Sequence, residues 1–103
     1  MSDAISASEA SEALGPLGWV VDGDAVRARF RTGSFTAGVE LIEAIAELAE
    51  EANHHPDVDL RFPSVTVHLS SHDIGGISRR DVLLGQQISA AARELDIEVE
   101  RED

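Results

Sequence analysis

The sequence contains no cysteine, no lysine and no tyrosine among its 103 residues. The absence of cysteine excludes a disulfide scaffold, an iron–sulfur cluster, a zinc site with thiolate ligands and a cysteine nucleophile. No stretch approaches the roughly 18 apolar residues of a membrane span. Residues 1–14 have neither the basic start nor the apolar run of a signal peptide. These absences favour a cytoplasmic protein with no membrane partner.

Basic residues are also scarce, because 8 arginines stand against 20 Asp and Glu residues, which gives a formal net charge of −12 at pH 7. Nucleic acids and anionic membrane surfaces bind proteins mainly through Lys and Arg, so neither is expected as a partner. Hydrophobic residues make up 43% of the chain, which is enough for a packed core. A chain of this length predicts a single domain over residues 1–103.

Hydrophobic patterning divides the chain into three helices and four strands. Ser6 and Glu9 have the spacing of a capping box, which predicts a first helix that ends at Gly15-Pro16. The other helices show apolar residues at helical spacing, and two hairpins show strict alternation. The predicted helices cover residues 6–14, 35–53 and 78–95, and the predicted strands cover residues 19–21, 25–31, 58–62 and 65–70.

The order α-β-β-α-β-β-α predicts an α+β fold in which the helices pack on one face of a four-stranded antiparallel sheet. Because apolar and polar residues alternate in both hairpins, the other sheet face should be exposed. It would carry the arginines of residues 25–31, which we expect to pair with acids such as Asp57 and Asp59 across strands. Residues 96–103 form an acidic tail, which we expect to be frayed at its end.

All four histidines lie within one stretch of nineteen residues, at positions 54, 55, 68 and 72. Imidazole gives and takes a proton near neutral pH, so several histidines in one pocket favour acid–base catalysis. A metal site is the alternative, but four strand residues would separate His68 from His72 by about 13 Å, too far for two ligands of one zinc ion. His68 also falls on the polar side of its strand, as a solvated or interface residue would. His54 and His55 are equally compatible with being polar residues at the C-terminal end of a helix, which Pro56 would terminate.

Two stretches around these histidines resemble the signature of the pterin-4a-carbinolamine dehydratases. In residues 50–62, an acid stands four residues before His-His-Pro and an aromatic residue stands six residues after the proline. In residues 65–81, a Ser-His pair follows the strand, and Gly-Ile-Ser-x-x-Asp begins the last helix. Gly18-Trp19 and the spacing of Phe30 and Phe35 also resemble the family, so that the likeness covers roughly residues 5–95.

The resemblance implies an activity as well as a fold. The family removes water from 4a-hydroxytetrahydrobiopterin to give quinonoid dihydrobiopterin, which belongs to tetrahydrobiopterin recycling, and it needs no cofactor and no metal. The chemistry suits histidine, because the C4a hydroxyl leaves only when protonated and N5–H must lose its proton as the C=N bond forms. The resemblance also implies a homodimer or homotetramer. The alternative function is a protein-interaction module of the same fold, with vestigial or different pterin binding.

Carried over residue by residue, the resemblance places His54, His55 and His72 in the active site, with Asp81 and Glu50 as supporting carboxylates. His54 and His72 would act as general acid and base from different sides of the pterin, while His55 mainly binds and orients the ring. The carboxylates would hold the histidines in the required tautomer or favour their protonated form.

Further substrate contacts are implied for Ser70, Ser71 and Asp73, together with the second histidine of the His-His-Pro motif. The two supporting carboxylates also have structural explanations. Asp81 stands three residues after a serine, where it would cap its helix in any case. Glu50 belongs to a regular acidic helix face, which is typical of a solvated surface.

Overall fold

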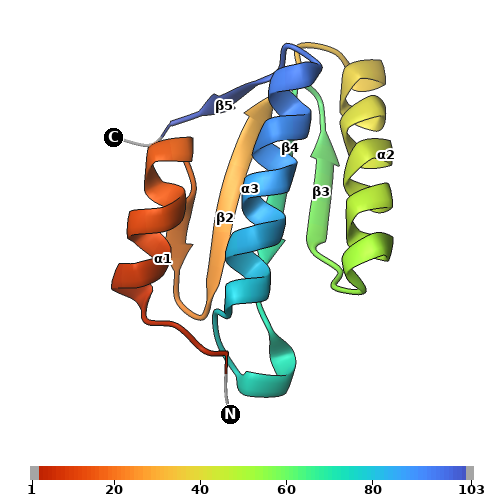
Figure 1. Cartoon of the computed structure of the whole chain (residues 1–103). Coiled ribbons are helices and arrows are strands. Elements are labelled where there is room, and N and C mark those ends of the chain that lie inside the picture. Colours follow the sequence, from red (N-terminus) through yellow and green to blue (C-terminus); the bar gives the residue numbers. More distant parts are fainter. Residues whose placement is uncertain (1–2, 102–103) are drawn as a thin grey trace.

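The computed structural model describes residues 3–101, in which three helices pack on one face of an antiparallel sheet (Figure 1). The predicted α+β fold is confirmed. The helices are α1 (Ala7–Leu14), α2 (Phe35–Ala52) and α3 (Arg79–Glu94), with 3-10 turns η1 (Gly15–Leu17) and η2 (His72–Ile74). The strands are β1 (Val20–Asp22), β2 (Ala25–Arg31), β3 (Asp57–Arg61), β4 (Ser64–Leu69) and β5 (Glu98–Glu100). No helix within this part of the chain is long and apolar enough to cross a membrane.

The strand order is β1-β2-β4-β3, and every pair is antiparallel. Strand β2 pairs with β4 along one edge, from Val26 opposite Leu69 to Arg31 opposite Ser64. Along its other edge β2 pairs first with β1, over residues 25–27, and then with β5, over residues 29–31. Strands β1 and β5 therefore follow one another along the same edge of β2.

The presence of β5 corrects the prediction of a four-stranded sheet followed by an acidic tail over residues 96–103. Glu98–Glu100 pairs in register with Arg29–Arg31, so the glutamates lie opposite the arginines on one sheet face. Arg31 Nη2 lies 4.0 Å from Glu100 Oε1. The acids that predicted a solvated tail thus complement a basic strand, and the sheet gains a fifth strand. The end of the predicted tail, where fraying was expected, lies outside the described residues.

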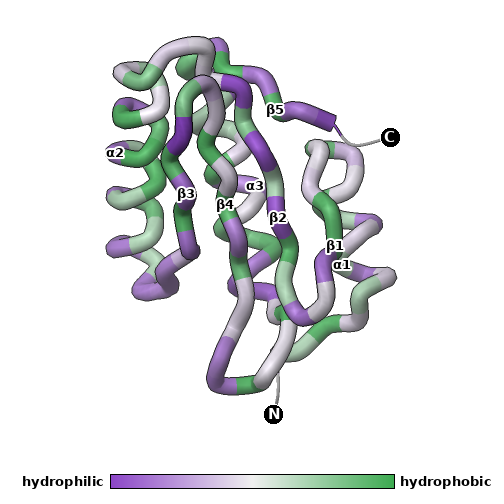
Figure 2. Tube along the Cα trace, turned by 180° about the vertical axis from the view of Figure 1, so that it is seen from behind, coloured by the Kyte–Doolittle hydropathy of each residue, from purple (hydrophilic) through white to green (hydrophobic). Residues whose placement is uncertain are grey.

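Hydrophilic and hydrophobic positions alternate along the strands, which Figure 2 shows from the side opposite the helices, so one face of the sheet is polar. The predicted pairing of its arginines with Asp57 and Asp59 is wrong, because β4 lies between β2 and β3. Arg27 Nε instead lies 3.1 Å from Asp22 Oδ2 on β1. The strand order decides which acids the arginines reach, and the hydrophobic pattern does not specify that order.

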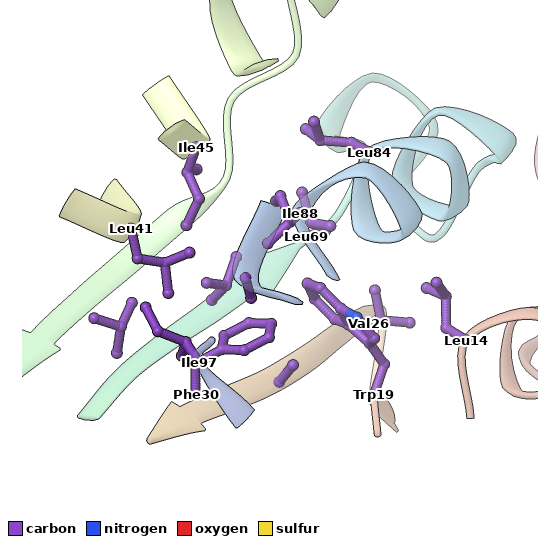
Figure 3. Close-up of a cluster of buried hydrophobic side chains, with 14 of the residues drawn as sticks. Leu14, Trp19, Val26, Phe30, Leu41, Ile45, Leu69, Leu84, Ile88 and Ile97 are labelled. Carbon is purple, nitrogen blue, oxygen red and sulfur yellow. The ribbon is translucent and has the colours of Figure 1, made fainter. Parts of the chain in front are cut away.

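The core lies between the sheet and the helices (Figure 3). The ring of Trp19 contacts Phe30 edge to face, with ring centroids 6.1 Å apart, and its Nε1 donates to Ser89 Oγ of α3 at 2.8 Å. This packing fixes α3 on the sheet and therefore positions the first turn of that helix. Buried side chains come from every layer and include Leu14, Val26, Phe30, Leu41, Ile45, Leu69, Leu84 and Ile88.

Candidate active site

Asp81 lies in the first turn of α3, and its side chain is completely buried. Ser78 caps this helix, because its Oγ accepts a hydrogen bond from Arg80 N at 3.2 Å. In return the backbone N–H of Ser78 donates to Asp81 Oδ2 at 2.9 Å. The predicted capping box is therefore confirmed. Capping leaves the second carboxylate oxygen, Oδ1, for another partner.

That partner is His54, whose Nε2 lies 2.6 Å from Asp81 Oδ1. The His54 side chain is 11% exposed. It reaches Asp81 because α2 ends at the left-handed residue Asn53, with φ 51°. The N–H of Asn53 donates to Glu50 O at 3.3 Å, and that of His54 donates to Ala49 O at 3.1 Å, the Schellman pattern of a helix end. The helix end thus positions the imidazole toward α3.

Two buried serines complete the surroundings of Asp81. Ser71 Oγ donates to Asp81 Oδ2 at 2.9 Å and lies 2.7 Å from Ser78 Oγ. The Ser78 hydroxyl also lies within hydrogen-bond distance of the carboxylate and can donate to Asp81 Oδ2, at 3.4 Å. A carboxylate oxygen accepts hydrogen bonds, so Nε2 of His54 is the donor in this contact. Nδ1 of His54 is then the nitrogen that can exchange a proton.

His55 pairs with Glu50 instead, on the surface. Its Nε2 lies 2.5 Å from Glu50 Oε2, and the two side chains are 58% and 75% exposed. Of the two predicted supporting carboxylates, Glu50 therefore contacts His55 and Asp81 contacts His54. Beside this pair, an apolar hollow of about 240 Å³ opens between α2 and β3, with Ile42 and Val58 in its wall.

The 3-10 turn η2 carries His72 and Asp73, which are both exposed. A pair of backbone hydrogen bonds between Ser71 and Gly76 closes this loop at its base, at 2.8 and 3.3 Å. Both carboxylate oxygens of Asp73 accept from Arg80 Nη2, at 3.0 and 3.1 Å. The buried Ser71 therefore joins the loop to the network around Asp81, and Arg80 joins it to α3.

Asp73 and Arg80 shift each other's pKa. The hydrogen bond from Arg80 lowers the pKa of Asp73, with smaller contributions from the charges of Arg80 and His54. The same hydrogen bond raises the pKa of Arg80. Sequence reasoning missed Arg80. Its signal was present, because an arginine in the first turn of a helix opposes the helix dipole and favours a nearby acid as partner.

The remaining predicted contact residues differ in accessibility. Ser70 follows β4 and is half-buried, whereas Ser71 is 1% exposed and its hydroxyl is already engaged. His68 lies on the exposed sheet face, opposite Arg27 on β2, as the alternation predicts. Across residues 3–101, no three His, Asp or Glu side chains gather into a group that could hold a metal ion.

The fold and the site define an α+β domain in which a histidine at the end of one helix contacts a buried, hydrogen-bonded aspartate in the first turn of another. The chain belongs to the pterin 4 alpha carbinolamine dehydratase family, whose model matches residues 3–91. The family predicted from the two histidine stretches is therefore confirmed.

Similar proteins include a Roseiflexus sp. (strain RS-1) protein named "Putative pterin-4-alpha-carbinolamine dehydratase", which is 40% identical over 89 residues. That alignment covers 85% of this chain and 96% of the relative. A Nocardia farcinica (strain IFM 10152) protein of the same name is 43% identical over 75 residues, which cover 73% of this chain and 79% of the relative.

Two solved structures share the fold. A transcriptional coactivator/pterin dehydratase from Brucella melitensis superposes with a TM-score of 0.78 at 31% identity, covering 85% of this chain and 97% of the other. A pterin dehydratase-like protein described as a RuBisCO assembly factor in the alpha-carboxysome gives a TM-score of 0.59 at 20% identity, covering 72% and 86%. The second likeness concerns the fold alone.

Proposed function

We propose that this protein removes water from 4a-hydroxytetrahydrobiopterin, giving quinonoid dihydrobiopterin for tetrahydrobiopterin recycling. The observation that carries the proposal is the contact of 2.6 Å between His54 Nε2 and the buried Asp81 Oδ1. Membership of the pterin carbinolamine dehydratase family supports the substrate class. The contact supports the reaction type, because it gives one imidazole a fixed tautomer and orientation.

The reaction needs two proton movements and no net change of charge. The C4a hydroxyl takes a proton and leaves as water, while N5 loses its proton and the N5=C4a double bond forms. Because Asp81 holds the Nε2 proton of His54, Nδ1 of that ring performs one of the two transfers. His72 on η2 performs the other, and the exposed pair of His55 with Glu50 binds and orients the pterin ring.

The neighbouring polar residues take separate roles in this proposal. Asp73, kept ionised by Arg80, accepts hydrogen bonds from the pterin, and the half-buried Ser70 supplies a hydroxyl. Ser71 was expected to touch the substrate. Its burial and its bond to Asp81 instead favour a positioning role, behind the His54 contact.

The test follows the formation of quinonoid dihydropterin from 4a-hydroxytetrahydrobiopterin over the spontaneous reaction. His54→Ala and His72→Ala should each lower kcat by about 10²-fold or more, the usual contribution of a general acid or base. His68→Ala is the matched control, because His68 lies on the exposed sheet face and should leave the rate unchanged. Equal rates in all three variants would contradict the proposed roles.

The alternative is a protein-interaction module, and the structural neighbour described as an assembly factor shows that this fold occurs in such a protein. A stable complex with another protein, together with negligible dehydratase turnover, would favour it. The implied homodimer or homotetramer is a separate prediction, which sedimentation of the full chain would test.

A further inference from the structure

A second hollow lies at the end of α3 away from the proposed active site. Its volume is about 350 Å³, and η1, β2, α3 and β5 contribute to its wall. Along α3, Arg93 beside this hollow stands about 18 Å from Asp81, at 1.5 Å per residue. Part of the wall, from Ile97 to Arg101, follows residue 91, where the match to the family model ends. The hollow is therefore a separate feature of this chain.

Six of the ten residues that line the hollow are apolar. Its one uncharged polar side chain is Ser89, which is 7% exposed and accepts the Trp19 Nε1 hydrogen bond at 2.8 Å. Within residues 3–101 the Ser89 hydroxyl donates to no protein group, so its proton is available to a ligand. The apolar lining side chains include Leu17, Phe30, Ala92, Ile97 and Val99.

Two guanidinium groups stand at the rim. Arg93 has no hydrogen-bond or ion-pair partner among the described residues, and Arg101 uses Nη2 to donate to Pro16 O at 2.9 Å. Glu98 also contributes to the wall, but it lies opposite Arg31 in the β2–β5 register. Because side chains alternate along a strand, its carboxylate belongs to the exposed sheet face. The rim is thus positive, in a chain of net charge −12.

We propose that this hollow binds a small organic carboxylate whose apolar body is about one aromatic ring in size. The ring would lie on the apolar surface around Phe30, and the carboxylate would accept hydrogen bonds from Arg93 and Arg101. The volume lies within the range of known ligand pockets, roughly 300–1,000 Å³. The positive rim selects the anion over a neutral compound of the same shape.

The chain carries its own reporter of binding, because Trp19 is the sole tryptophan. It bonds to Ser89 and contacts Phe30, and both residues line the hollow. Titrating 3-phenylpropionate into the full chain should change the tryptophan fluorescence saturably. The neutral analogue 3-phenylpropanamide should bind at least about tenfold more weakly, the scale of one charge-assisted hydrogen bond.

Variants test the rim directly. Arg93→Gln and Arg101→Gln should each raise the Kd for 3-phenylpropionate about tenfold. Arg61→Gln removes the same charge from β3, outside the hollow, and should change the Kd less than twofold. Circular dichroism verifies folding, and the comparison with the amide needs no variant. No saturable change at millimolar concentration, equal binding of the amide, or equal weakening by Arg61→Gln would overturn the proposal.

Discussion

His54 Nε2 and Asp81 Oδ1 lie 2.6 Å apart, and this contact joins the C-terminal end of α2 to the first turn of α3. The opposite oxygen of Asp81 accepts from Ser71 and from the capping residue Ser78. The same carboxylate therefore caps a helix, anchors the loop that carries His72 and orients His54. A change at any of these partners should therefore alter the orientation of the His54 imidazole.

Asp81→Asn tests the orientation of His54. The amide NH₂ can turn toward Nε2 and donate to it, which moves the ring proton to Nδ1. With the wrong tautomer, kcat should fall by about 10²–10⁴-fold, the upper end being the loss for the equivalent change in a serine-protease triad. Imidazole ¹⁵N NMR should show the change of tautomer. Asp96→Asn, at an exposed left-handed position that asparagine tolerates, is the control. An unchanged tautomer with full activity would refute the orienting role.

Ser71→Ala should lower the free energy of unfolding by about 1–3 kcal/mol, because Asp81 and Ser78 would each lose a buried partner. Ser70→Ala is the matched control, since Ser70 is only half-buried, and should stay within about 0.5 kcal/mol. Urea denaturation measures both. For activity, Ser70→Ala should raise KM, as a substrate contact would. Equal stabilities of the two variants would argue against the network around Asp81.

The local parts of the fold could be predicted from the sequence. Each of two helix starts is marked by a pair of residues only three positions apart, Ser6 with Glu9 and Ser78 with Asp81. Both pairs form the expected capping box. The predicted helix and strand boundaries differ from the observed ones by at most one residue. These elements depend on short-range spacing, which a sequence displays directly.

Other features depend on pairing across the fold. Strand β5 has three residues, two of them glutamates, and only the arginines of β2 make it favourable. The contact of His54 with Asp81 spans 27 positions, and composition alone does not indicate it. The family resemblance identified both residues but assigned no partner to either. The position of Arg80 in the first turn of a helix favours an acidic partner, but the identity of that acid depends on where η2 places Asp73.

Arg80→Gln should raise the pKa of Asp73 toward its ordinary value of 3.8, because the hydrogen bond that lowers it is removed. A lowered pKa in the folded state stabilises the protein above the unfolded pKa, and this contribution is lost as pH falls through the folded value. At neutral pH the variant should therefore have a slightly lower free energy of unfolding than the wild type. Below about pH 4 its free energy of unfolding should depend less on pH. Carboxyl NMR titration measures the pKa directly. Arg79→Gln, outside the contact with Asp73, should leave it unchanged.

Gly18→Ala tests whether β5 packs as an integral part of the fold. Gly18 has φ +93°, and a Cβ there would lie 2.6 Å from Val99 Cγ1. Overpacking should cost about 1–3 kcal/mol, in addition to the strain of the positive φ. Adding Val99→Ala removes the clash but not the backbone strain. The free energy of unfolding of the double variant should therefore fall by less than the sum of the losses in the two single variants. Strict additivity in urea denaturation would show that β5 does not contact Gly18.

In the proposed reaction, His54 after α2 and His72 on η2 transfer the protons of a pterin dehydration. Its most direct test is the rate of quinonoid dihydropterin formation from 4a-hydroxytetrahydrobiopterin by the wild type and by the double variant His54→Ala/His72→Ala. We expect the wild type to accelerate the reaction and the folded double variant to return it to the spontaneous rate. A double variant as fast as the wild type would contradict this proposal.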